Sequence, residues 1–465
     1  MTFAEDRVAR PAVSPDAAGF PVDFVWGAAT ASYQIEGAVA EDGRLPSIWD
    51  TFSAEPGRVV GGDTGAMAAD HYHRWRDDVA LMDKLRLGAY RFSVAWPRIQ
   101  PTGSGPVNAS GLAFYDRLVD ELLAHDLDPW VTLYHWDLPQ TLEDRGGWPE
   151  RETALRFAEF SGHVAAALGD RVRHWITLNE PWCSAFLGYA AGSHAPGRSE
   201  PAAAIAAAHH LMLGHGFAVD AVRAVSGQAL IGPTVNLYPV HPKPGHPDAA
   251  DAVRRIDGLQ NRWFLDPLLR GGYPDDVRAD LERVTDFHFE RDGDDAIHNR
   301  PIDFLGVNYY SSLVVRPSAF PGSNAVDFVD SGRPRTAMGW GIDKDGLTET
   351  LRRVHDDYGP LPLYVTENGA AFDDVVAPDD RIVDVERRDY LAAHLHACQL
   401  AIEAGVPLAG YFVWSLLDNF EWAEGYRRRF GIVHVDYGTQ ERRVKESGAW
   451  YSAFIDRHRD GRGRP

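Results

Sequence analysis

Cysteine is nearly absent from this sequence, which has only Cys183 and Cys398 among its 465 residues. Two cysteines cannot build a disulfide framework in a chain of this length, so we expect a reducing, cytoplasmic location. Cys398 falls on the apolar face of an expected helix and is interpreted as a core residue. A nucleophilic role is conceivable for Cys183, but no matching histidine and asparagine accompany it, and we expect it to fill space.

Basic residues are few, and long apolar runs are missing. The sequence has 46 Lys and Arg against 67 Asp and Glu, a net charge of -21, which argues against a nucleic acid or an anionic membrane as partner. No run of about 18 apolar residues occurs, so no membrane-spanning helix is expected. Residues 1–20 lack the pattern of a secretory signal. The compact basic cluster Arg427 to Arg429 is interpreted as solvated.

A dividing linker and internal repeats are absent as well, so we expect one domain despite the length. Hydrophobic residues make up 45% of the chain, and 14 Trp, 17 Tyr and 21 Phe suffice for a large core and an aromatic-lined pocket. The expected catalytic domain covers residues 19–455, with a disordered extension over 1–18 and a frayed tail over 456–465.

Short apolar runs alternate with amphipathic segments along the chain. The runs are Phe24–Ala29, Ala89–Ala95, Pro129–Tyr134, His174–Leu178, Leu230–Val235, Asp303–Val307, Leu363–Thr366 and Leu408–Trp414. Segments such as Trp75 to Leu85 and Leu112 to Leu122 carry apolar residues at three- and four-residue spacing, typical of helices with one buried face. The alternation predicts an α/β fold, a single (β/α)8 TIM barrel. A doubly wound open sheet would alternate too, but no Gly-x-Gly-x-x-Gly stretch follows an early strand.

Three connections are too long for simple turns: residues 37–70, 311–345 and 416–437. Each follows the carboxyl end of an expected strand, and that face of a barrel carries the active site. We therefore expect these loops to build and roof a pocket.

Two acidic pentapeptides end expected strands: Thr177 to Pro181, which contains Glu180, and Val365 to Gly369, which contains Glu367. In a closed parallel barrel both carboxyl groups lie at the same mouth. A carboxylic acid and a carboxylate in that arrangement can cleave a glycosidic bond with retention of configuration. The alternative, that each glutamate is an ordinary solvated loop residue, is less convincing for two glutamates in matching positions.

Polar and aromatic side chains gather at the other strand ends. Amide and carboxyl groups can bind sugar hydroxyls, and an indole can pack against the apolar face of a sugar ring. Any one of these residues would be weak evidence, so the hypothesis of a sugar site rests on their convergence. They are Gln34, Arg91, His135, Trp136, Asn179, Asn308, Tyr310, Trp414, Glu421 and Trp422.

Nearly the whole chain resembles glycoside hydrolase family 1, the retaining β-glucosidases and their relatives. The matching stretches are residues 24–37 (FVWGAATASYQIEG), 90–99 (YRFSVAWPRI), 134–139 (YHWDLP), 177–181 (TLNEP), 305–311 (LGVNYYS), 365–369 (VTENG), 414–422 (WSLLDNFEW) and 429–433 (RFGIV). The resemblance implies Glu367 as nucleophile and Glu180 as general acid and then base. It also implies a set of residues around the sugar: Gln34, His135, Asn179, Glu421 and Trp422 at the hydroxyls, and Trp414 under the ring.

The roles of the two glutamates can also be argued from their expected neighbours. Glu367 must be ionised to attack the anomeric carbon, and Arg91 and Tyr310 can favour that state. Glu180 must begin protonated, and the charge of Glu367 together with the apolar surroundings of Trp136 should raise its pKa. Once the glycosyl ester forms, the charge of Glu367 is gone, and Glu180 becomes a better base for activating water.

Further substrate contacts are expected from Trp136, Asn308 and Tyr310, and Trp340 is expected to line the aglycone entrance. Family members often have an acidic residue after that tryptophan, where this chain has Gly341. This departure concerns the leaving groups that fit and not the carboxyl pair.

The expected substrate is a β-glucoside or a short β-linked oligosaccharide. Glu421 can accept hydrogen bonds from the 4- and 6-hydroxyls and would repel a 6-phosphate, which disfavours phosphorylated sugars. It can accept from either orientation of the 4-hydroxyl, so β-galactosides and β-fucosides are expected substrates too. Glu180 stands where the thioglucosidases of the family carry Gln, which favours oxygen glycosides.

No cofactor or metal is expected, because two carboxyl groups suffice for the hydrolysis. Asp70, His71 and His73 are suggestive, but residues two apart on a helix point in different directions, and no further ligands with zinc-like spacing follow. The histidines between His209 and His215 are interpreted as helix-surface or packing residues.

Two functions from other classes stay open. A non-catalytic sugar-binding barrel would keep the aromatic and amide groups without needing the carboxyl pair. A transglycosylase would use the same covalent intermediate with a sugar or alcohol in place of water. The sequence also leaves open the oligomeric state, the natural aglycone and the preference among glucosides, galactosides and fucosides.

Overall fold

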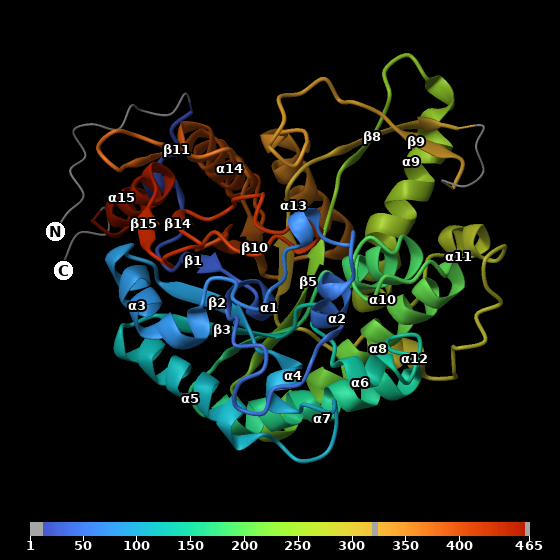
Figure 1. Ribbon diagram of the computed structural model, residues 1–465. Coiled ribbons are helices and arrows are strands. Elements are labelled where there is room, and N and C mark those ends of the chain that lie inside the picture. The colour runs from blue at the N-terminus through green and yellow to red at the C-terminus, as the bar shows by residue number, and fades with distance from the viewer. Residues whose placement is uncertain (1–12, 319–323, 461–465) are drawn as a thin grey trace.

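The computed structural model describes residues 13–318 and 324–460, and its centre is a closed barrel of parallel strands (Figure 1). Each strand pairs with the next barrel strand along the chain, and β13 closes the ring by pairing with β1. The strands are β1 (Val25–Ala29), β2 (Ala89–Ser93), β3 (Asp128–Tyr134), β4 (His174–Asn179), β5 (Leu230–Asn236), β7 (Leu305–Asn308), β10 (Leu363–Asn368) and β13 (Leu408–Trp414). Every one falls on an expected apolar run, and the predicted (β/α)8 barrel is confirmed.

The barrel strands are buried on both faces because side chains fill the interior and helices cover the outside. All residues of β2, for example, are buried. Aromatic rings close one end of the interior, where the ring of Trp130 lies 5.0 Å from that of Phe412 and 4.7 Å from that of Tyr364. The barrel is therefore a packed core, and a ligand can enter only at the other end.

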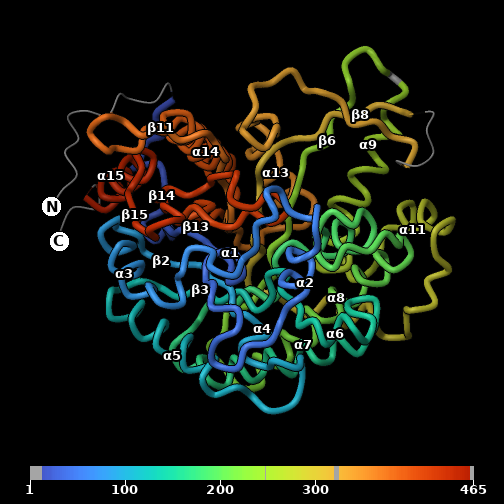
Figure 2. The backbone as a smooth tube through the Cα atoms, viewed as in Figure 1, coloured from blue at the N-terminus to red at the C-terminus, as the bar shows by residue number. Residues whose placement is uncertain are grey.

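α-Helices connect the strands and surround the barrel. Helices α3, α5, α7 and α8 follow one another around the lower rim of the view in Figure 2. The helices are α1 (Ser32–Ile35), α2 (Ile48–Ala54), α3 (His71–Lys84), α4 (Trp96–Ile99), α5 (Ala109–Ala124), α6 (Gln140–Glu143), α7 (Arg151–Leu168), α8 (Pro201–Val225), α9 (Ala250–Asp257), α10 (Trp263–Leu269), α11 (Asp275–Leu281), α12 (Asp294–His298), α13 (Lys344–Tyr358), α14 (Val385–Glu403) and α15 (Glu446–Asp460).

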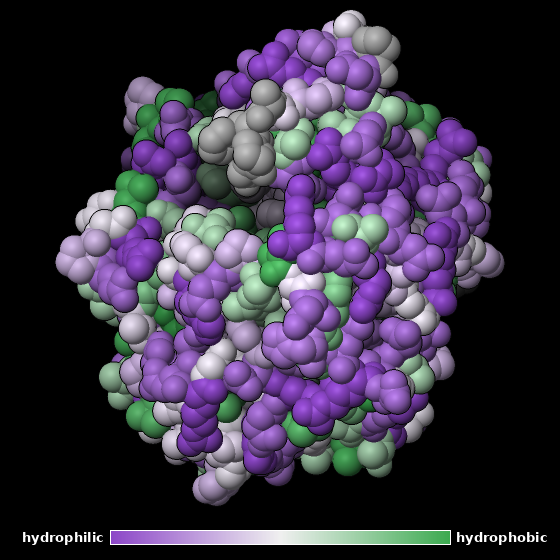
Figure 3. Space-filling view, turned by 90° about the vertical axis from the view of Figure 1, so that its right-hand side faces the viewer, coloured by the Kyte–Doolittle hydropathy of each residue, from purple (hydrophilic) through white to green (hydrophobic). Residues whose placement is uncertain are grey.

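Smaller elements decorate the loops. Short strands are β6 (Val240–Pro242), β8 (Leu313–Pro317), β9 (Val326–Phe328), β11 (Val375–Val376), β12 (Ile382–Val383), β14 (Val433–Val435) and β15 (Arg442–Val444). Short turns of 3-10 helix are η2 (Ala17–Gly19), η3 (Val60–Gly62), η5 (Pro247–Ala249) and η8 (Trp422–Glu424), and π-helical segments are η4 (Cys183–Ala190) and η6 (Gly258–Arg262). The side of the molecule that carries α9 and α11 is mostly hydrophilic, with hydrophobic residues in small separate patches (Figure 3).

The helix faces expected from apolar spacing are buried. Trp75, Val79 and Met82 of α3 lie against the core, and Cys398 of α14 is a free, buried cysteine as expected. Among the described residues, α8 alone is long and apolar enough to cross a membrane, and 83% of its apolar stretch is buried inside the fold. It is therefore a core helix.

Two expectations about the carboxyl-terminal part were wrong. Residues 456–460, expected to fray, continue α15, because Trp26 donates a hydrogen bond to His458 Nδ1 at 3.1 Å and stacks edge-on against Phe454. Arg429, expected to be solvated, forms an ion pair with the buried Asp418 at 2.6 Å. In the expected disordered extension 1–18, Ala17 and Ala18 instead belong to η2, which Asp16 caps. Residues 1–12 and 461–465 lie outside the described residues.

Candidate active site

The carboxyl ends of the barrel strands open into a pocket of about 540 Å³, on the face where barrel enzymes assemble their sites. Its wall combines carboxyl groups with aromatic rings from strand ends and from the loops 311–345 and 416–437, as predicted. The third long loop, 37–70, stands behind the wall, where Trp49 packs on Trp422 with ring centroids 4.6 Å apart. The expected site residues that line the pocket are His135, Trp136, Glu180, Tyr310, Trp340, Glu367, Trp414, Glu421 and Trp422.

The other expected site residues, Gln34, Arg91, Asn179 and Asn308, are buried beside the residues that line the pocket. Each forms a hydrogen bond with a residue that lines the pocket. The structure thus brings the whole expected set together, with a lining layer and a supporting layer that the sequence did not distinguish.

Glu367, on β10, is held by two donors. Its Oε1 accepts a hydrogen bond from Arg91 Nη1 at 2.6 Å, and its Oε2 accepts one from the Tyr310 hydroxyl at 2.6 Å. Burial raises the pKa of this carboxyl group, and Arg91 and Tyr310 oppose that rise. A buried carboxylate with a cation and a hydroxyl donor in contact is stabilised in its ionised form.

Gly369 lets the ends of β10 and β13 approach closely. A Cβ atom at this position would lie 1.7 Å from the carbonyl oxygen of Trp414. No other residue fits without moving one of the two strand ends, which carry Glu367 and Trp414. The glycine of the 365–369 stretch therefore has a packing role.

Glu180 follows β4 in a strained backbone conformation, with φ of 46°, while its backbone N–H donates to Thr234 of β5 at 2.9 Å. Its Oε1 accepts from Asn308 Nδ2 at 2.7 Å, and its Oε2 accepts from the Cys183 thiol at 3.2 Å. Burial, followed by the negative charge of Glu367, raises its pKa to about 8. Unlike Glu367, this carboxyl group forms no ion pair with any residue that the structure describes, and its surroundings favour the protonated form.

Cys183 fills space beside the site, as expected, and also contacts the carboxyl group of Glu180. Burial raises the pKa of its thiol well above the ordinary value, and the contact with the Glu180 carboxyl group adds to the effect. The residue is therefore a neutral thiol and a poor nucleophile. This hydrogen bond could not be predicted from the sequence, because only the turn at the start of η4 brings the thiol to Glu180.

One hydrogen-bond chain links the two glutamates. Arg91, which binds Glu367, also donates from Nη2 to Asn179 Oδ1 at 2.6 Å. Asn308 donates from Nδ2 to that same oxygen at 3.1 Å and to Glu180. The chain fixes the position of one carboxyl group relative to the other.

His135 and Gln34 each keep a buried polar atom without a partner among the described residues: His135 Nδ1 and Gln34 Oε1. Burial, together with Arg91, lowers the pKa of His135 well below its usual value, so the ring is neutral. Its Nε2 faces Asn179 Nδ2 at 3.1 Å and must accept, which leaves the proton on Nδ1. Native proteins rarely leave buried polar atoms unpaired, so an orphan donor and an orphan acceptor fit ligand hydroxyls.

Glu421 is joined to this group through Gln34, whose Nε2 donates to its Oε2 at 3.3 Å. Burial, followed by the charge of Glu367, raises the pKa of Glu421 to about 8. Glu180 and Glu424 push it in the same direction. The surroundings of Glu421 therefore disfavour any further negative charge.

Indole rings form one side of the pocket. Trp422 packs against Trp136 at 4.6 Å between ring centroids, and Trp414 stacks on His135 at 5.7 Å. Trp136 and Trp422 have φ of 76° and 47°, a backbone conformation that is unusual for bulky residues and common at functional sites. The sequence predicted these rings but not the backbone strain that places them.

Apolar residues that the sequence reasoning missed complete the pocket: Trp182, Leu187, Phe328, Met338 and Phe430. Leu187 lies in η4, Trp182 directly before it, and the others in β9 and the long loops, where single apolar residues carry no periodic signal. Trp340 joins them, as expected, with its ring 5.3 Å from that of Tyr310.

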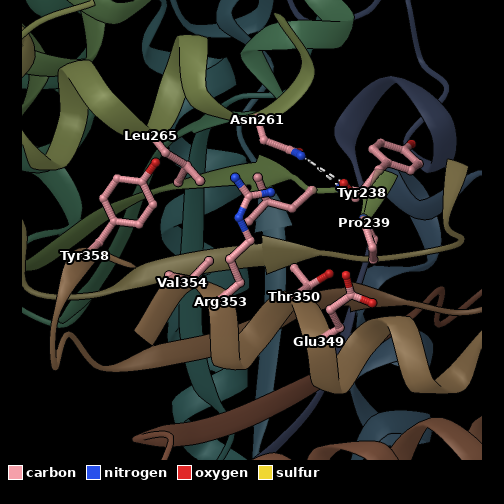
Figure 4. A pocket seen from close by; sticks show the side chains of 10 residues that line it. Tyr238, Pro239, Asn261, Leu265, Glu349, Thr350, Arg353, Val354 and Tyr358 are labelled. Carbon is pink, nitrogen blue, oxygen red and sulfur yellow. Dashed lines mark hydrogen bonds between the residues drawn. The ribbon is translucent and has the colours of Figure 1, made fainter. Parts of the chain in front are cut away.

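A second, small cavity of about 20 Å³ lies between α10 and α13. Tyr238, Asn261, Arg353 and Tyr358 are among its lining residues (Figure 4), and Asn261 Nδ2 donates to the carbonyl oxygen of Tyr238 at 2.8 Å. The space suits about one water molecule and is too small for a sugar.

The histidines that suggested a metal site, His71 and His73, bind neighbouring carboxylates. His71 bonds to Asp78 at 2.8 Å and His73 to Asp70 at 2.6 Å. In the described part of the chain, no group of three or more His, Cys, Asp or Glu is arranged to hold a metal ion. The histidines between His209 and His215 are buried in α8 and are packing residues.

Comparisons with known proteins agree with this geometry. Residues 16–460 match the model of glycosyl hydrolase family 1. A thermostable β-glucosidase B from Thermobispora bispora is 52% identical, over 96% of this chain and 93% of that protein. A bifunctional β-D-glucosidase/β-D-fucosidase from Bifidobacterium breve is 50% identical, over 94% of this chain and 98% of that protein.

A solved structure agrees as well. The β-glucosidase from Thermotoga maritima in complex with glucoimidazole has a TM-score of 0.91 with this chain at 48% identity, covering 94% of this chain and 99% of that one. The fold, the match over nearly the whole length and the carboxyl pair at the barrel mouth lead to one conclusion: the chain belongs to glycosyl hydrolase family 1.

Proposed function

We propose that this protein is a retaining β-glucosidase in which Glu367 is the nucleophile and Glu180 is the general acid and then the general base. The observation that carries the assignment is the contrast between the two carboxyl groups. Arg91 and Tyr310 contact Glu367 and favour its ionised form, whereas burial and the charge of Glu367 disfavour ionisation of Glu180. Two carboxyl groups whose surroundings separate their pKa values are what a nucleophile and an acid require.

The first half-reaction forms a glycosyl ester. A carboxylate oxygen of Glu367 attacks the anomeric carbon while the bond to the leaving oxygen breaks and Glu180 donates its proton to that oxygen. Retention requires that no water lies between the carboxyl groups. Their link through Arg91, Asn179 and Asn308 supports such closeness.

The second half-reaction returns the enzyme to its starting state. Esterification removes the negative charge of Glu367, which is the second largest cause of the raised pKa of Glu180. Glu180, now an anion, takes a proton from water, and the water oxygen attacks the anomeric carbon as Glu367 leaves. The hydrogen bonds from Asn308 and Cys183 favour Glu180 in this ionised form.

The glycone is held by the unpaired atoms of the site. His135 Nδ1 supplies a donor and Gln34 Oε1 an acceptor for sugar hydroxyls. Asn179, fixed by Arg91 and with one Nδ2 hydrogen directed to His135, offers the second Nδ2 hydrogen to the 2-hydroxyl, and Glu421 binds the 4- and 6-hydroxyls. Trp414 stacks under the ring, and Trp422 packs beside it.

Asn308 is better described as a positioning residue than as a substrate contact. Its amide nitrogen is engaged by Glu180 and Asn179, and its carbonyl oxygen accepts from Thr366 Oγ1 at 2.8 Å. Its partners thus occupy both ends of the side chain.

The glycone range we propose is β-glucosides, β-fucosides and β-galactosides. The Bifidobacterium breve relative is named for activity on glucosides and fucosides, and the Thermotoga maritima structure holds glucoimidazole. A 6-phosphate would lie near Glu421, whose surroundings include Glu367, Glu180 and Glu424. Phosphorylated glycones are therefore disfavoured. A cytoplasmic location, which the two free buried thiols suit, is likewise a proposal.

The test is chromophore release from aryl β-glucoside, β-fucoside, β-galactoside and 6-phospho-β-glucoside, beside the variant Glu367→Ala. We expect turnover of the unphosphorylated substrates and essentially none in the variant, because no other nucleophile is in place. Wild-type rates in a folded Glu367→Ala variant would refute the assignment. Turnover of the 6-phospho substrate alone would refute the glycone range.

A further inference from the structure

Six charged residues form a buried ion network beside the pocket: Asp374, Asp384, Arg387, Asp418, Arg429 and Lys445. Their side chains are at most 4% exposed, apart from Arg429 at 24%. Three carboxylates balance three cations, so the network carries no net charge. None of these side chains lines the pocket.

Lys445 is the centre of the ion network. Its Nζ lies 2.7 Å from Asp418 Oδ1 and 2.6 Å from Asp374 Oδ2. Asp418 in turn binds Arg429 through Oδ2 and accepts from the Gly431 backbone N–H at 3.0 Å. Although burial would raise the pKa of Asp418, Lys445 and Arg429 hold it below the usual value.

Arg387 of α14 connects two carboxylates of the ion network to the backbone of two loops. It binds Asp384 and Asp374, and its Nε donates to the carbonyl oxygen of Ala370 at 3.1 Å. Its Nη2 donates to the carbonyl oxygen of Arg429 at 2.7 Å.

The ion network joins the loop that follows Glu367 to the loop that carries Glu421. Ala370 and Asp374 lie in the loop that follows Glu367, and Asp418 and Arg429 lie on either side of Glu421 in the loop that follows Trp414. The segment between Asp418 and Arg429 carries Glu421, and the network pins both of its ends.

A buried ion network of this kind is a poor way to gain stability, because desolvation offsets most of the attraction between the charges, whereas its directional bonds fix geometry. We propose that the ion network is a positioning device which sets Glu421 against Glu367 and thereby determines selectivity for sugars that carry a 6-hydroxymethyl group. This inference rests on the proposed role of Glu421 in binding the 4- and 6-hydroxyls.

The experiment compares kcat/KM for aryl β-glucoside with that for aryl β-xyloside, which has the same ring hydroxyls but lacks the hydroxymethyl group. In Lys445→Met the ratio of the two values should fall about tenfold, because a hydrogen bond to a carboxyl group contributes about that factor and depends on its placement. The rate on the xyloside should change much less. Asp418→Asn, which keeps an acceptor for Gly431, provides a second variant if Lys445→Met does not fold.

Two reference variants separate the possible causes. Asp294→Asn weakens the ion pair with Arg151, neither residue of which lines the pocket, and should lower Tm without changing the ratio. Glu421→Gln should lower the ratio directly. If it does not, the proposed role of Glu421 is wrong. If it does, and the ratio is unchanged in folded Lys445→Met or Asp418→Asn, the ion network is only structural and our inference is overturned.

Discussion

Replacing Glu180 by Ala tests most directly whether Glu180 is the general acid and Glu367 the nucleophile. Glu180 is 6% exposed, and its raised pKa of about 8 favours the protonated form. At pH 6, well below that pKa, nearly all molecules hold the proton. The variant therefore loses a general acid that is present in nearly every wild-type molecule.

The expected loss depends on the leaving group. A positioned general acid contributes about 10²- to 10⁴-fold, or about 3 to 5 kcal/mol of the barrier. A poor leaving group such as the second glucose of cellobiose needs that proton and should lose the full factor in kcat/KM. A dinitrophenolate leaves without it and should lose less than about tenfold.

The assay is the pH dependence of kcat/KM on cellobiose and on dinitrophenyl β-glucoside in wild type and Glu180→Ala. In the wild type, kcat/KM on cellobiose should fall as pH rises through about 8, because Glu180 loses its proton. The variant should lack this alkaline decline. Equal losses on both substrates, or an unchanged alkaline decline in the variant, would show that Glu180 is not the acid. Asp294→Asn, at a residue that does not line the pocket, serves as the control for effects on folding.

Two further outcomes follow from the surroundings of Glu180. Cys183→Ala removes a hydrogen bond to the ionised Glu180 carboxylate and should move the alkaline decline of kcat/KM upward by at most about one pH unit. Cys183→Ser should return the decline to its wild-type pH. A pH profile that is unchanged in both variants would contradict a hydrogen bond between Cys183 and Glu180. Because the folded-state pKa of Glu180 is raised, the folded protein binds more protons than the unfolded chain between the two pKa values, and stability is lost as pH rises from about 4.5 to about 8. Glu180→Gln cannot ionise, so its Tm advantage over wild type should be larger at pH 8 than at pH 5; a constant difference in calorimetry would argue against the raised pKa.

The structure also changes how the glycone specificity is understood. From the sequence, Glu421 is expected to repel phosphate through its negative charge. Its pKa is raised to about 8 because it is buried near Glu367. A phosphate is therefore excluded by the surrounding carboxyl groups together and not by the charge of Glu421 alone. Phosphate discrimination should therefore persist when Glu421 itself is neutral.

The sequence by itself determined the barrel and the identity of the residues at its mouth. Strand runs and amphipathic segments are local patterns, and parallel strands in a closed barrel leave no choice about where Glu180 and Glu367 must lie. The polar and aromatic residues at the strand ends followed from the same reasoning. The patterns that predict these features each extend over only a few neighbouring residues of the chain.

Tertiary structure alone decided what each of these residues touches. Arg91 and Glu367 are far apart along the chain yet in direct contact, and no periodicity encodes such a pair. The thiol contact of Cys183, the buried ion network around Lys445 and the helical residues 456–460 were missed for the same reason. Burial and hydrogen-bond partners set pKa values, and both arise only when the barrel closes and the long loops pack across it.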